Sequence, residues 1–478
     1  MTNYDKLYIG GDWVAPQSTD LVDVVSPHTE EVIARVPDGG PADIDAAVAA
    51  ARTAFDEGPW PRMTPGERAD VMARLGEIYA ARLGDMAQVI TDEMGSPITF
   101  SQIAQAPMPM LILQFFTDLV RDFAFEERRE GMLGPVLVRR EPIGVAAAIT
   151  AWNTPQFVAI SKIAPALGAG CTVVLKAPLE APLDAYLLGE IAHEAGLPPG
   201  VLNIVPAGVA GGEHLVSHPG VDTVAFTGST VVGRRIATAC GALLRPVTLE
   251  LGGKSAAIVL DDADLDVLAG GLELASFLNN GEACIAQTRI LASRSRYDEV
   301  VDCVASVAAG FKVGDPNDPT TNVGPLVNER HRARVESYIA LGQEEGAKIV
   351  TGGGRPAGQT QGWYVEPTVF SGARNDMRIA QEEIFGPVVV VIPYEDQADA
   401  IRIANDSDYG LAGSVWTADA DRGLDVARQV RTGTYGINGY LMDFVAPFGG
   451  YKASGLGREF GPEGLYEYLE HKTIAGIA

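Results

Sequence analysis

Residues 249–288 have the sequence LELGGKSAAIVLDDADLDVLAGGLELASFLNNGEACIAQT, and this stretch indicates both the fold and the chemistry of the chain. Glu250 stands near its start in an apolar frame, and Cys284 stands near its end between small and apolar residues. The segment between them is weakly amphipathic, with clustered aspartates that suit a turn and a helix start. A turn and a helix can bring both ends to one cleft, where a thiol beside a base is an activated nucleophile.

Apolar runs alternate with helical patterns on the N-terminal side of this stretch. Strands are predicted at residues 145–150, 172–175, 201–205, 223–226 and 247–251. Helices are predicted between them at residues 155–168, 183–195, 211–217 and 230–240. This βαβ alternation predicts a parallel sheet with helices on both faces, and ligands bind such sheets beyond the carboxyl ends of the strands.

A second α/β pattern follows on the C-terminal side. It predicts strands at residues 256–260, 349–350, 369–370 and 388–392 and helices at residues 265–279 and 297–311. Near the N-terminus, the sequence predicts a hairpin at Gly10-Gly11 and helices at residues 42–55, 64–82 and 85–93. Residues 133–142 are β-prone and charged, which is typical of an edge strand that pairs with another subunit, and the tail at residues 473–478 can join the same sheet.

The composition limits the class of protein. A chain of 478 residues is too long for one ordinary core, so two or three domains are expected. With 47% hydrophobic and 21% charged residues, it has the composition of a globular enzyme. The net charge of −26 argues against nucleic acid and anionic membranes as partners, and the simplest interpretation is that acidity serves solubility.

The cysteines and the hydropathy pattern bear on compartment. The four cysteines have no CxxC spacing, so neither zinc nor any other metal site is expected, and a reducing environment is favoured. The N-terminus has no basic or apolar region of a signal peptide, and a cytoplasmic location is therefore predicted. The most apolar window, residues 104–120, is predicted to be too short and too polar to span a bilayer, and to form a buried helix.

Polar groups stand at the predicted carboxyl ends of three strands. Gly228 in FTGST opens a helix, which suits a phosphate, although a simple glycine turn has the same pattern. Lys176 can bind a ribose hydroxyl or a phosphate, or be a solvated lysine. Asn153 in WNTP can donate its amide to an oxyanion together with the Cys284 backbone N–H, or it can cap a turn.

Two further segments lie near the C-terminus. In QEEIFGP, residues 381–387, the acids can pair with ribose hydroxyls and Phe385 can pack on a flat ring, but a helix end before a Gly-Pro turn gives the same pattern. PFGGYKASGLGRE, residues 447–459, is dense in glycine, which indicates a tightly packed loop.

Taken together, these segments resemble the aldehyde dehydrogenase superfamily over nearly the whole chain. LELGGKS and FLNNGEACIAQT are similar to its base and cysteine signatures, and WN, FTGST, EEIFGP and PFGGYKASGLGRE occur in the family order. The resemblance implies an NAD(P)-dependent, non-acylating oxidoreductase with an α/β fold. It implies a Rossmann-like cofactor domain at residues 1–123 and 143–252, an α/β catalytic domain at residues 253–462, and a small protruding oligomerisation β-sheet from residues 124–142 and 463–478. A homodimer or homotetramer is then expected.

The mechanism that the resemblance implies is covalent. Cys284 attacks the carbonyl of a small-molecule aldehyde, and Asn153 with the Cys284 backbone N–H holds the oxyanion of the thiohemiacetal. Hydride transfer to the nicotinamide leaves a thioester, which water activated by Glu250 hydrolyses to the acid. Lys162 and Glu459 match family positions for a proton relay near the base.

The resemblance also implies the cofactor contacts. They are Ile149, Thr150, Trp152, Lys176, Glu180, Gly208, Gly212, Phe226, Thr227, Gly228, Ser229, Val232, Leu251, Gly252, Glu383 and Phe385. Many NAD-using members carry a ribose-binding glutamate at the position of Leu179, and the acid here is Glu180. This departure leaves NADP open, but the lack of an added Arg or Lys beside Leu179 favours NAD.

The substrate tunnel of the family matches residues that are mostly apolar here. They are Thr154, Gln156, Phe157, Ala283, Ile285, Tyr440, Leu441, Met442, Asp443 and Phe444. A medium or bulky hydrophobic aldehyde is therefore expected; Asp443 leaves an amino aldehyde open, and the lack of a cation disfavours acidic semialdehydes. The rivals are a CoA-acylating enzyme, which has no need of Glu250, a thiol esterase that merely binds nucleotide, and a silent structural relative, which would have lost Cys284 or Glu250.

Overall fold

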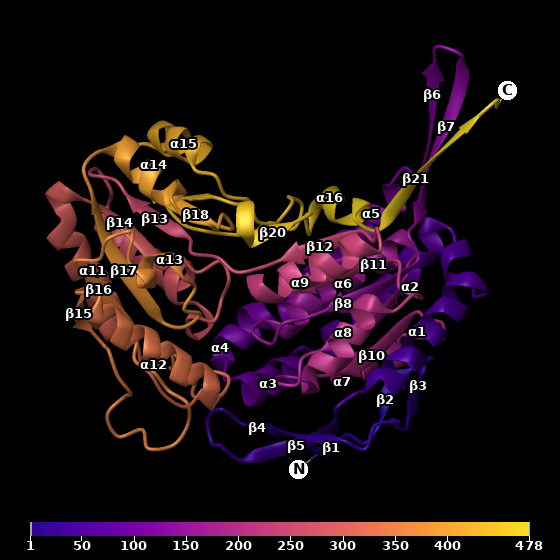
Figure 1. Cartoon of the computed structure of the whole chain (residues 1–478), viewed down its shortest axis with the longest axis horizontal. Helices are drawn as coiled ribbons and strands as arrows, with labels where there is room; N and C mark the ends of the chain where they lie inside the picture. The colour runs from indigo at the N-terminus through magenta and orange to yellow at the C-terminus, as the bar shows by residue number, and fades with distance from the viewer. Residues whose placement is uncertain (1, 478) are drawn as a thin grey trace.

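The computed structural model describes residues 2–477; Met1 and Ala478, which end two of the predicted segments, lie outside the described residues. Within them, an eight-stranded sheet and a seven-stranded sheet form the centres of two bodies that lie side by side, and a narrow three-stranded sheet projects from the first body (Figure 1). The predicted α/β architecture is confirmed.

The centre of the eight-stranded sheet is parallel, with the order β12-β11-β8-β9-β10. Its strands are β8 (Val145–Ile149), β9 (Thr172–Ala177), β10 (Leu202–Pro206), β11 (Thr223–Thr227) and β12 (Val247–Glu250). The intervening helices are α6 (Pro155–Ala169), α7 (Leu183–Glu194), α8 (Val209–Ser217) and α9 (Thr230–Ala242). The strand order reverses at β8, so a ligand crevice is expected where β8 and β11 end.

The edges of this sheet are antiparallel. β2 (Leu7–Ile9) and β3 (Asp12–Val14) form the predicted hairpin on one edge, because Gly10 and Gly11 take the positive φ values of a tight turn. On the other edge, β20 (Gly455–Leu456) pairs with β12, so a late segment of the chain closes the sheet beside Glu250. That pairing brings the glycine-rich loop to the end of β12.

The N-terminal segment covers the first body. A small sheet contains β1 (Thr2–Asn3), β4 (Leu21–Val25) and β5 (Val32–Pro37). The three predicted helices are confirmed as α1 (Pro41–Asp56), α2 (Pro65–Ala81) and α3 (Leu83–Met94). Short 3₁₀ turns elsewhere are η1 (Trp60–Arg62), η4 (Asn279–Gly281), η5 (Arg294–Arg296) and η6 (Lys452–Ser454).

The prediction that the apolar window was too short to span a bilayer was wrong. One helical run of 25 residues contains α4 (Ile98–Phe100), the π turn η2 (Ser101–Gln105) and α5 (Pro107–Asp122). By length and composition alone, this run is long and apolar enough to cross a membrane. Pro107 and Pro109 stand at the start of α5, where a missing N–H is tolerated. Half of the most apolar 18-residue window of the run is buried, and α5 packs on α2 and α6, so the expectation of a buried helix holds for that face.

The second sheet has the order β15-β16-β17-β14-β13-β18-β19. Its strands are β13 (Ala256–Val259), β14 (Arg289–Ser293), β15 (Lys348–Thr351), β16 (Thr368–Ser371), β17 (Val388–Tyr394), β18 (Gly413–Trp416) and β19 (Gly436–Ile437). Its helices are α10 (Leu265–Leu272), α11 (Tyr297–Gly310), α12 (Glu329–Glu344), α13 (Arg378–Gln381), α14 (Gln397–Asn405) and α15 (Ala420–Gln429). The helix expected at residues 265–279 ends earlier, because a π turn, η3 (Glu273–Phe277), follows α10.

The projecting sheet joins the two predicted edge segments. β6 (Glu126–Gly131) and β7 (Gly134–Pro142) form a hairpin, and β21 (Leu469–Ala475), which follows α16 (Gly461–Tyr466), pairs antiparallel with β7. Figure 1 shows this sheet standing clear of both bodies. The prediction that the C-terminal tail joins the same sheet as residues 133–142 is confirmed.

Candidate active site

A cavity of about 770 Å³ opens where β8, β11 and β12 end and faces the segments that lead into the second sheet. Four of the predicted catalytic residues line it, and so do half of the predicted cofactor contacts. The former are Cys284, Glu250, Asn153 and Glu459, and the latter are Trp152, Thr227, Gly228, Ser229, Leu251, Gly252, Glu383 and Phe385. The two ends of the stretch at residues 249–288 therefore meet in one cavity.

A tight loop places Cys284. The loop begins at Asn279–Gly281, where all three residues have positive φ (51°, 60° and 73°), which asparagine and glycine adopt most readily. A Cβ at Gly281 would lie 2.2 Å from the carbonyl carbon of Gly386, and a Cβ at Gly253 would lie 2.4 Å from the carbonyl oxygen of Cys284. Glycine at both positions lets the loop of the thiol pack directly against the two neighbouring segments.

The surroundings of the Cys284 thiol favour its protonated form. Burial, and then the carboxylates of Glu250 and Glu383, raise the pKa of Cys284 above that of an ordinary thiol. The other three cysteines do not line the cavity. A thiol with a raised pKa needs a neighbouring base before it can attack a carbonyl.

Glu250, at the end of β12, is such a base. Its side chain is buried, and neither carboxyl oxygen accepts a well-formed hydrogen bond among residues 2–477, although the backbone N–H of Gly450 lies near enough to lower its pKa. Burial, and then the Glu459 carboxylate, raise the pKa of Glu250 well above the usual carboxyl range, while the Lys162 ammonium opposes the rise. A buried polar group left without partners costs about 1–3 kcal/mol, so its retention in a cavity suggests a chemical use.

Lys162 and Glu459 form a buried ion pair beside this base. Lys162 Nζ, on α6, donates to Glu459 Oε1 at 2.6 Å and to Thr227 Oγ1 at 2.6 Å. The lysine side chain is 1% exposed and the glutamate side chain 6%. Because Glu459 also lines the cavity and acts on the pKa of Glu250, the two predicted relay residues lie next to the predicted base.

Asn153 is held by the loop that carries the thiol. Its side-chain Nδ2 donates to Glu282 O at 2.9 Å, and its backbone carbonyl oxygen accepts a hydrogen bond of 2.8 Å from Asn279 Nδ2. Gln105, in the π turn η2, donates to Asn279 Oδ1 at 3.0 Å. An amide has two N–H donors, so the Asn153 side chain keeps one for the cavity that it lines with Cys284.

Glu383 lies in another part of the same cavity. Its Oε1 accepts the Gly253 N–H at 2.9 Å, and Arg334 donates to its carbonyl oxygen at 2.6 Å. Burial raises the pKa of Glu383 to about 7. Nearby, Phe385 and Trp152 pack edge to face with ring centres 5.5 Å apart and form an apolar wall.

Comparison with known proteins identifies the family. The model of the aldehyde dehydrogenase family matches residues 13–474. The chain belongs to the aldehyde dehydrogenase family. It is 49% identical to the geranial dehydrogenase of Castellaniella defragrans, over 99% of this chain and 98% of that protein.

Two solved structures are also similar. The aldehyde dehydrogenase of Mycobacterium tuberculosis complexed with NAD+ is 50% identical, with a TM-score of 0.98 over 99% of this chain and 98% of that one. A mutant of aldehyde dehydrogenase C from Pseudomonas syringae, complexed with NAD+ and octanal, is 43% identical, with a TM-score of 0.96 over 99% of this chain and 97% of that one.

The residues of this aldehyde dehydrogenase fit a dinucleotide. The N-terminus of α9 opens on the cavity, and a Cβ at Gly228 would lie 2.5 Å from the Phe226 ring, so only glycine leaves that backbone free to approach a phosphate. Lys176 lies near the end of β9 and is half-buried; burial lowers its pKa, and the Glu180 and Asp38 carboxylates oppose that shift. An ammonium at this strand end suits a ribose hydroxyl or a phosphate.

The remaining predicted cofactor contacts do not line the cavity: Ile149, Thr150, Lys176, Glu180, Gly208, Gly212, Phe226 and Val232. Glu180 pairs with the exposed Arg330 at 3.4 Å, and the Gly208 N–H donates to Asp38 Oδ1 at 2.9 Å at the start of α8. These residues lie along the ends of β8–β10 and the starts of α8 and α9, outside the cavity itself.

Three of the predicted tunnel residues are not among those that line the cavity. Gln156 is fully buried and donates to Asp184 Oδ2 at 2.5 Å, Asp443 accepts the Val445 N–H of its own loop, and Phe444 packs on Phe460. Each lies close in sequence to a lining residue. The tunnel residues that do line the cavity are Thr154, Phe157, Ala283, Ile285, Tyr440, Leu441 and Met442.

Sequence reasoning missed other polar residues at the site. Asn279 and Glu282 stand in the cysteine signature itself, and the Asn-Asn-Gly turn was a usable signal for them. Gln105 comes from a π turn in an apolar helix, and Arg334 from α12, whose mostly polar sequence gave no helix prediction. For these two no local pattern indicated a place beside the thiol.

Proposed function

We propose that this protein oxidises a hydrophobic aldehyde to its carboxylic acid with NAD, through a thiohemiacetal and a thioester on Cys284. The observation that carries the proposal is one cavity lined by Cys284, the unbonded carboxyl of Glu250, the amide of Asn153 and a mostly apolar wall. A nucleophile, a base and an oxyanion donor together are what acyl chemistry on a carbonyl requires.

The first step is nucleophilic attack. Glu250 takes the thiol proton of Cys284, and the sulfur attacks the aldehyde carbon to form a thiohemiacetal. The free N–H of the Asn153 amide and the Cys284 backbone N–H stabilise the oxyanion that develops. Because the Asn153 amide is held by Glu282 O, it is already oriented when substrate binds.

The second half of the reaction is hydrolysis. Glu250 takes a proton from water, the hydroxide attacks the thioester carbon, and the carbon–sulfur bond breaks to release the acid and the Cys284 thiolate. The Lys162–Glu459 pair provides a buried route by which the proton leaves Glu250. A CoA-acylating enzyme has no need of this base, and the unbonded Glu250 favours hydrolysis.

NAD would be held by the N-terminus of α9, Lys176, Glu383 and the Phe385–Trp152 wall. When bound, the nicotinamide supplies the hydride acceptor. The NAD+ complexes of the two solved relatives support this choice. A preference for NADP in kinetic assays would contradict it.

The substrate class follows from the wall of the cavity. Ile103, Leu274 and Leu441 line the cavity although they are 65%, 48% and 89% exposed, so its opening is apolar. Such an opening favours an apolar molecule over a charged one. The geranial dehydrogenase and the octanal complex among the relatives support a terpenoid or long aliphatic aldehyde. Asp443 faces its own loop, which weakens the amino-aldehyde alternative.

The direct test is a spectrophotometric assay of NAD and NADP reduction with geranial, octanal, an amino aldehyde and an acidic semialdehyde. We expect reduction with the apolar aldehydes and its loss in Cys284→Ala, which keeps the fold. Reduction that survives in Cys284→Ala would overturn the mechanism. Absence of reduction with every pair would favour the silent structural relative, and acyl-CoA formation with added CoA would favour the acylating rival.

A charge at the opening tests the substrate class. Leu441→Lys should raise KM for octanal by about tenfold, the effect of losing one good apolar contact. Leu244 is 92% exposed and does not line the cavity, so Leu244→Lys is the matched control and should leave KM unchanged. Equal KM values in the two variants would exclude this opening as the aldehyde's entrance.

We also propose the division into domains and the assembly. Residues 1–123 and 143–252 would bind the cofactor, residues 253–462 would complete the catalytic site, and residues 124–142 and 463–478 would assemble subunits into a homodimer or homotetramer. β20 pairs with β12, so the catalytic segment also contributes a strand to the cofactor sheet. Sedimentation analysis should show the oligomer, and deletion of β21 should reduce it to monomer.

A further inference from the structure

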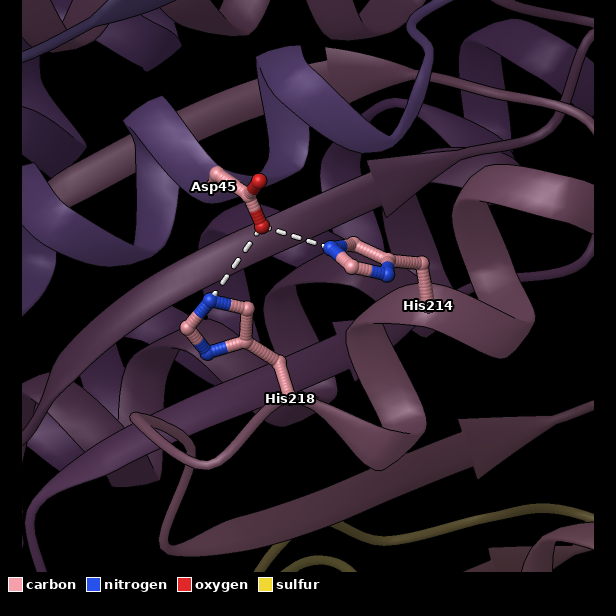
Figure 2. A group of neighbouring side chains, drawn as sticks. All are labelled: Asp45, His214 and His218. Atoms are coloured by element: carbon pink, nitrogen blue, oxygen red, sulfur yellow. Dashed lines mark hydrogen bonds and ion pairs between the residues drawn. The ribbon is translucent and has the colours of Figure 1, made fainter.

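Three side chains from two helices converge far from the motifs that define the active site. Asp45 lies on α1, His214 lies on α8, and His218 directly follows α8. Asp45 Oδ1 is 2.5 Å from His214 Nε2 and 3.3 Å from His218 Nε2. Figure 2 shows both imidazole rings pointing at the same carboxylate oxygen.

We propose that Asp45, His214 and His218 bind a divalent transition-metal ion such as Ni²⁺ or Zn²⁺. Two imidazole nitrogens and a carboxylate oxygen are the donors that these ions prefer. The three donor atoms all lie within 4.8 Å of one another. Histidines four residues apart reach the same side of a helix end, and the third ligand comes from the neighbouring helix.

The exposure of the group suits an open site. The side chains of Asp45 and His214 are 57% and 35% exposed, so they can move apart by the few tenths of an ångström that an ion requires, and water can complete its coordination. The site does not share a residue with the lining of the catalytic cavity.

Two contacts oppose the ion and predict moderate affinity. The Gly220 N–H donates to His218 Nδ1 at 2.9 Å, which places the proton of the neutral ring on Nε2, the atom that faces Asp45. Metal binding through Nε2 therefore moves this proton to Nδ1 and breaks the Gly220 hydrogen bond. Arg245 donates to His218 O at 2.7 Å and adds a positive charge nearby.

The ion would connect α1 to α8. Gly208, at the start of α8, is one of the predicted cofactor contacts, so the ion would fix a helix that carries such a contact. An ion that binds the folded chain but not the unfolded chain raises the melting temperature. Metal-dependent stability is therefore the expected consequence, with no direct part in catalysis.

The test is calorimetric titration of untagged protein with Ni²⁺, followed by thermal unfolding with and without the ion. We expect one site per chain and a metal-dependent rise in melting temperature. Affinity should fall about tenfold or more in His214→Ala, in His218→Ala and in Asp45→Asn, and the rise should vanish in the double variant His214→Ala/His218→Ala. These partly exposed positions should leave the fold of the metal-free variants intact, which circular dichroism checks.

The exposed His193→Ala is the matched control, since this histidine contacts Gly11 O and lies outside the group. Its titration should match that of the unchanged protein. A second titration with Co²⁺ recognises binding at the catalytic thiol. Co²⁺ bound to a thiolate has a charge-transfer band that imidazole and carboxylate ligands lack. Full binding in the double variant, no binding at millimolar Ni²⁺, or equal weakening in His193→Ala would overturn the site.

Discussion

Glu250 and Glu383 are two carboxyls that line the same cavity in different surroundings, the first buried and the second half-buried. Burial is the largest cause of a raised pKa in both. Glu383 accepts a hydrogen bond of 2.9 Å from the Gly253 N–H, whereas Glu250 has a weak approach from the Gly450 N–H and no well-formed hydrogen bond in the described chain. The bonded acid is fixed in place and suited to holding a ligand, and the unbonded acid keeps its lone pairs for a proton.

The charges beyond these bonds increase the difference. The Glu459 carboxylate raises the pKa of Glu250, and the Lys162 and Arg458 cations oppose that rise, whereas the charges beside Glu383 come from Lys254 and Arg334 and all favour its ionised form. Two acids of one type can therefore take different roles because of their neighbours alone.

The largest effect is expected for Glu250→Gln. An amide cannot take a proton from the thiol or from water, so kcat should fall by about 10²–10⁴-fold while the shape of the cavity is kept. Steady-state NAD reduction measures kcat, and rapid-mixing measurement of the first turnover separates attack from hydrolysis. A loss of less than tenfold would show that another group is the base.

Asn153→Ala should come next. Removing one oxyanion donor lowers kcat by about 10²–10³-fold, with a smaller effect on aldehyde KM. Asn279→Ala is the informative comparison, because Asn279 donates to the backbone oxygen of Asn153 and to Glu282 O, not to the Asn153 side chain, and should act through its position. If both variants lost the same fraction of kcat, the Asn153 amide would not be the donor.

Much of this site could be predicted because the chemistry is local in sequence. Glu250 lies in a predicted strand and Cys284 lies beyond a predicted helix, so apolar periodicity located both ends of the stretch, and the resemblance to the family supplied their roles. The βαβ alternation predicted a parallel sheet, but the order β12-β11-β8-β9-β10 was not predicted.

What could not be predicted depends on contacts between distant segments. The Lys162–Glu459 pair joins residues 297 positions apart, and no local pattern reports that the glutamate would also raise the pKa of Glu250. Asp45 and His214 are 169 positions apart, so the absence of a CxxC pattern said nothing about them. β14 was missed because it begins with Arg289, a buried arginine that local hydropathy assigns to the surface.

Glu383→Gln tests the bonded acid. Glutamine still accepts the Gly253 N–H, so the loop should stay in place, but a ribose hydroxyl would lose a charged acceptor. We expect KM for NAD to rise by about tenfold and kcat with saturating NAD to change less. Fluorescence titration of NAD binding in the same variant separates affinity from turnover. A loss in kcat as large as that of Glu250→Gln would remove the contrast between the two acids.

The smallest effects concern the pH profile, and two variants should move it in opposite directions. Activity requires ionised Glu250, whose pKa is raised, so kcat should fall as pH falls through that pKa. Lys162→Met removes a cation that lowers the pKa of Glu250, so the acid limb should move to higher pH. Glu459→Gln removes a carboxylate that raises it, so the acid limb should move down.

A purely structural role for the pair would lower kcat at every pH and leave the midpoint of the acid limb unchanged. The profile therefore separates an electrostatic action on Glu250 from a loss of packing. Shifts in the same direction in Lys162→Met and Glu459→Gln would contradict the assignment of Glu250 as the titrating base, because the two removed charges have opposite signs. Opposite shifts would show that the buried pair sets the proton affinity of Glu250, the cavity carboxyl with no well-formed hydrogen bond on either oxygen among residues 2–477.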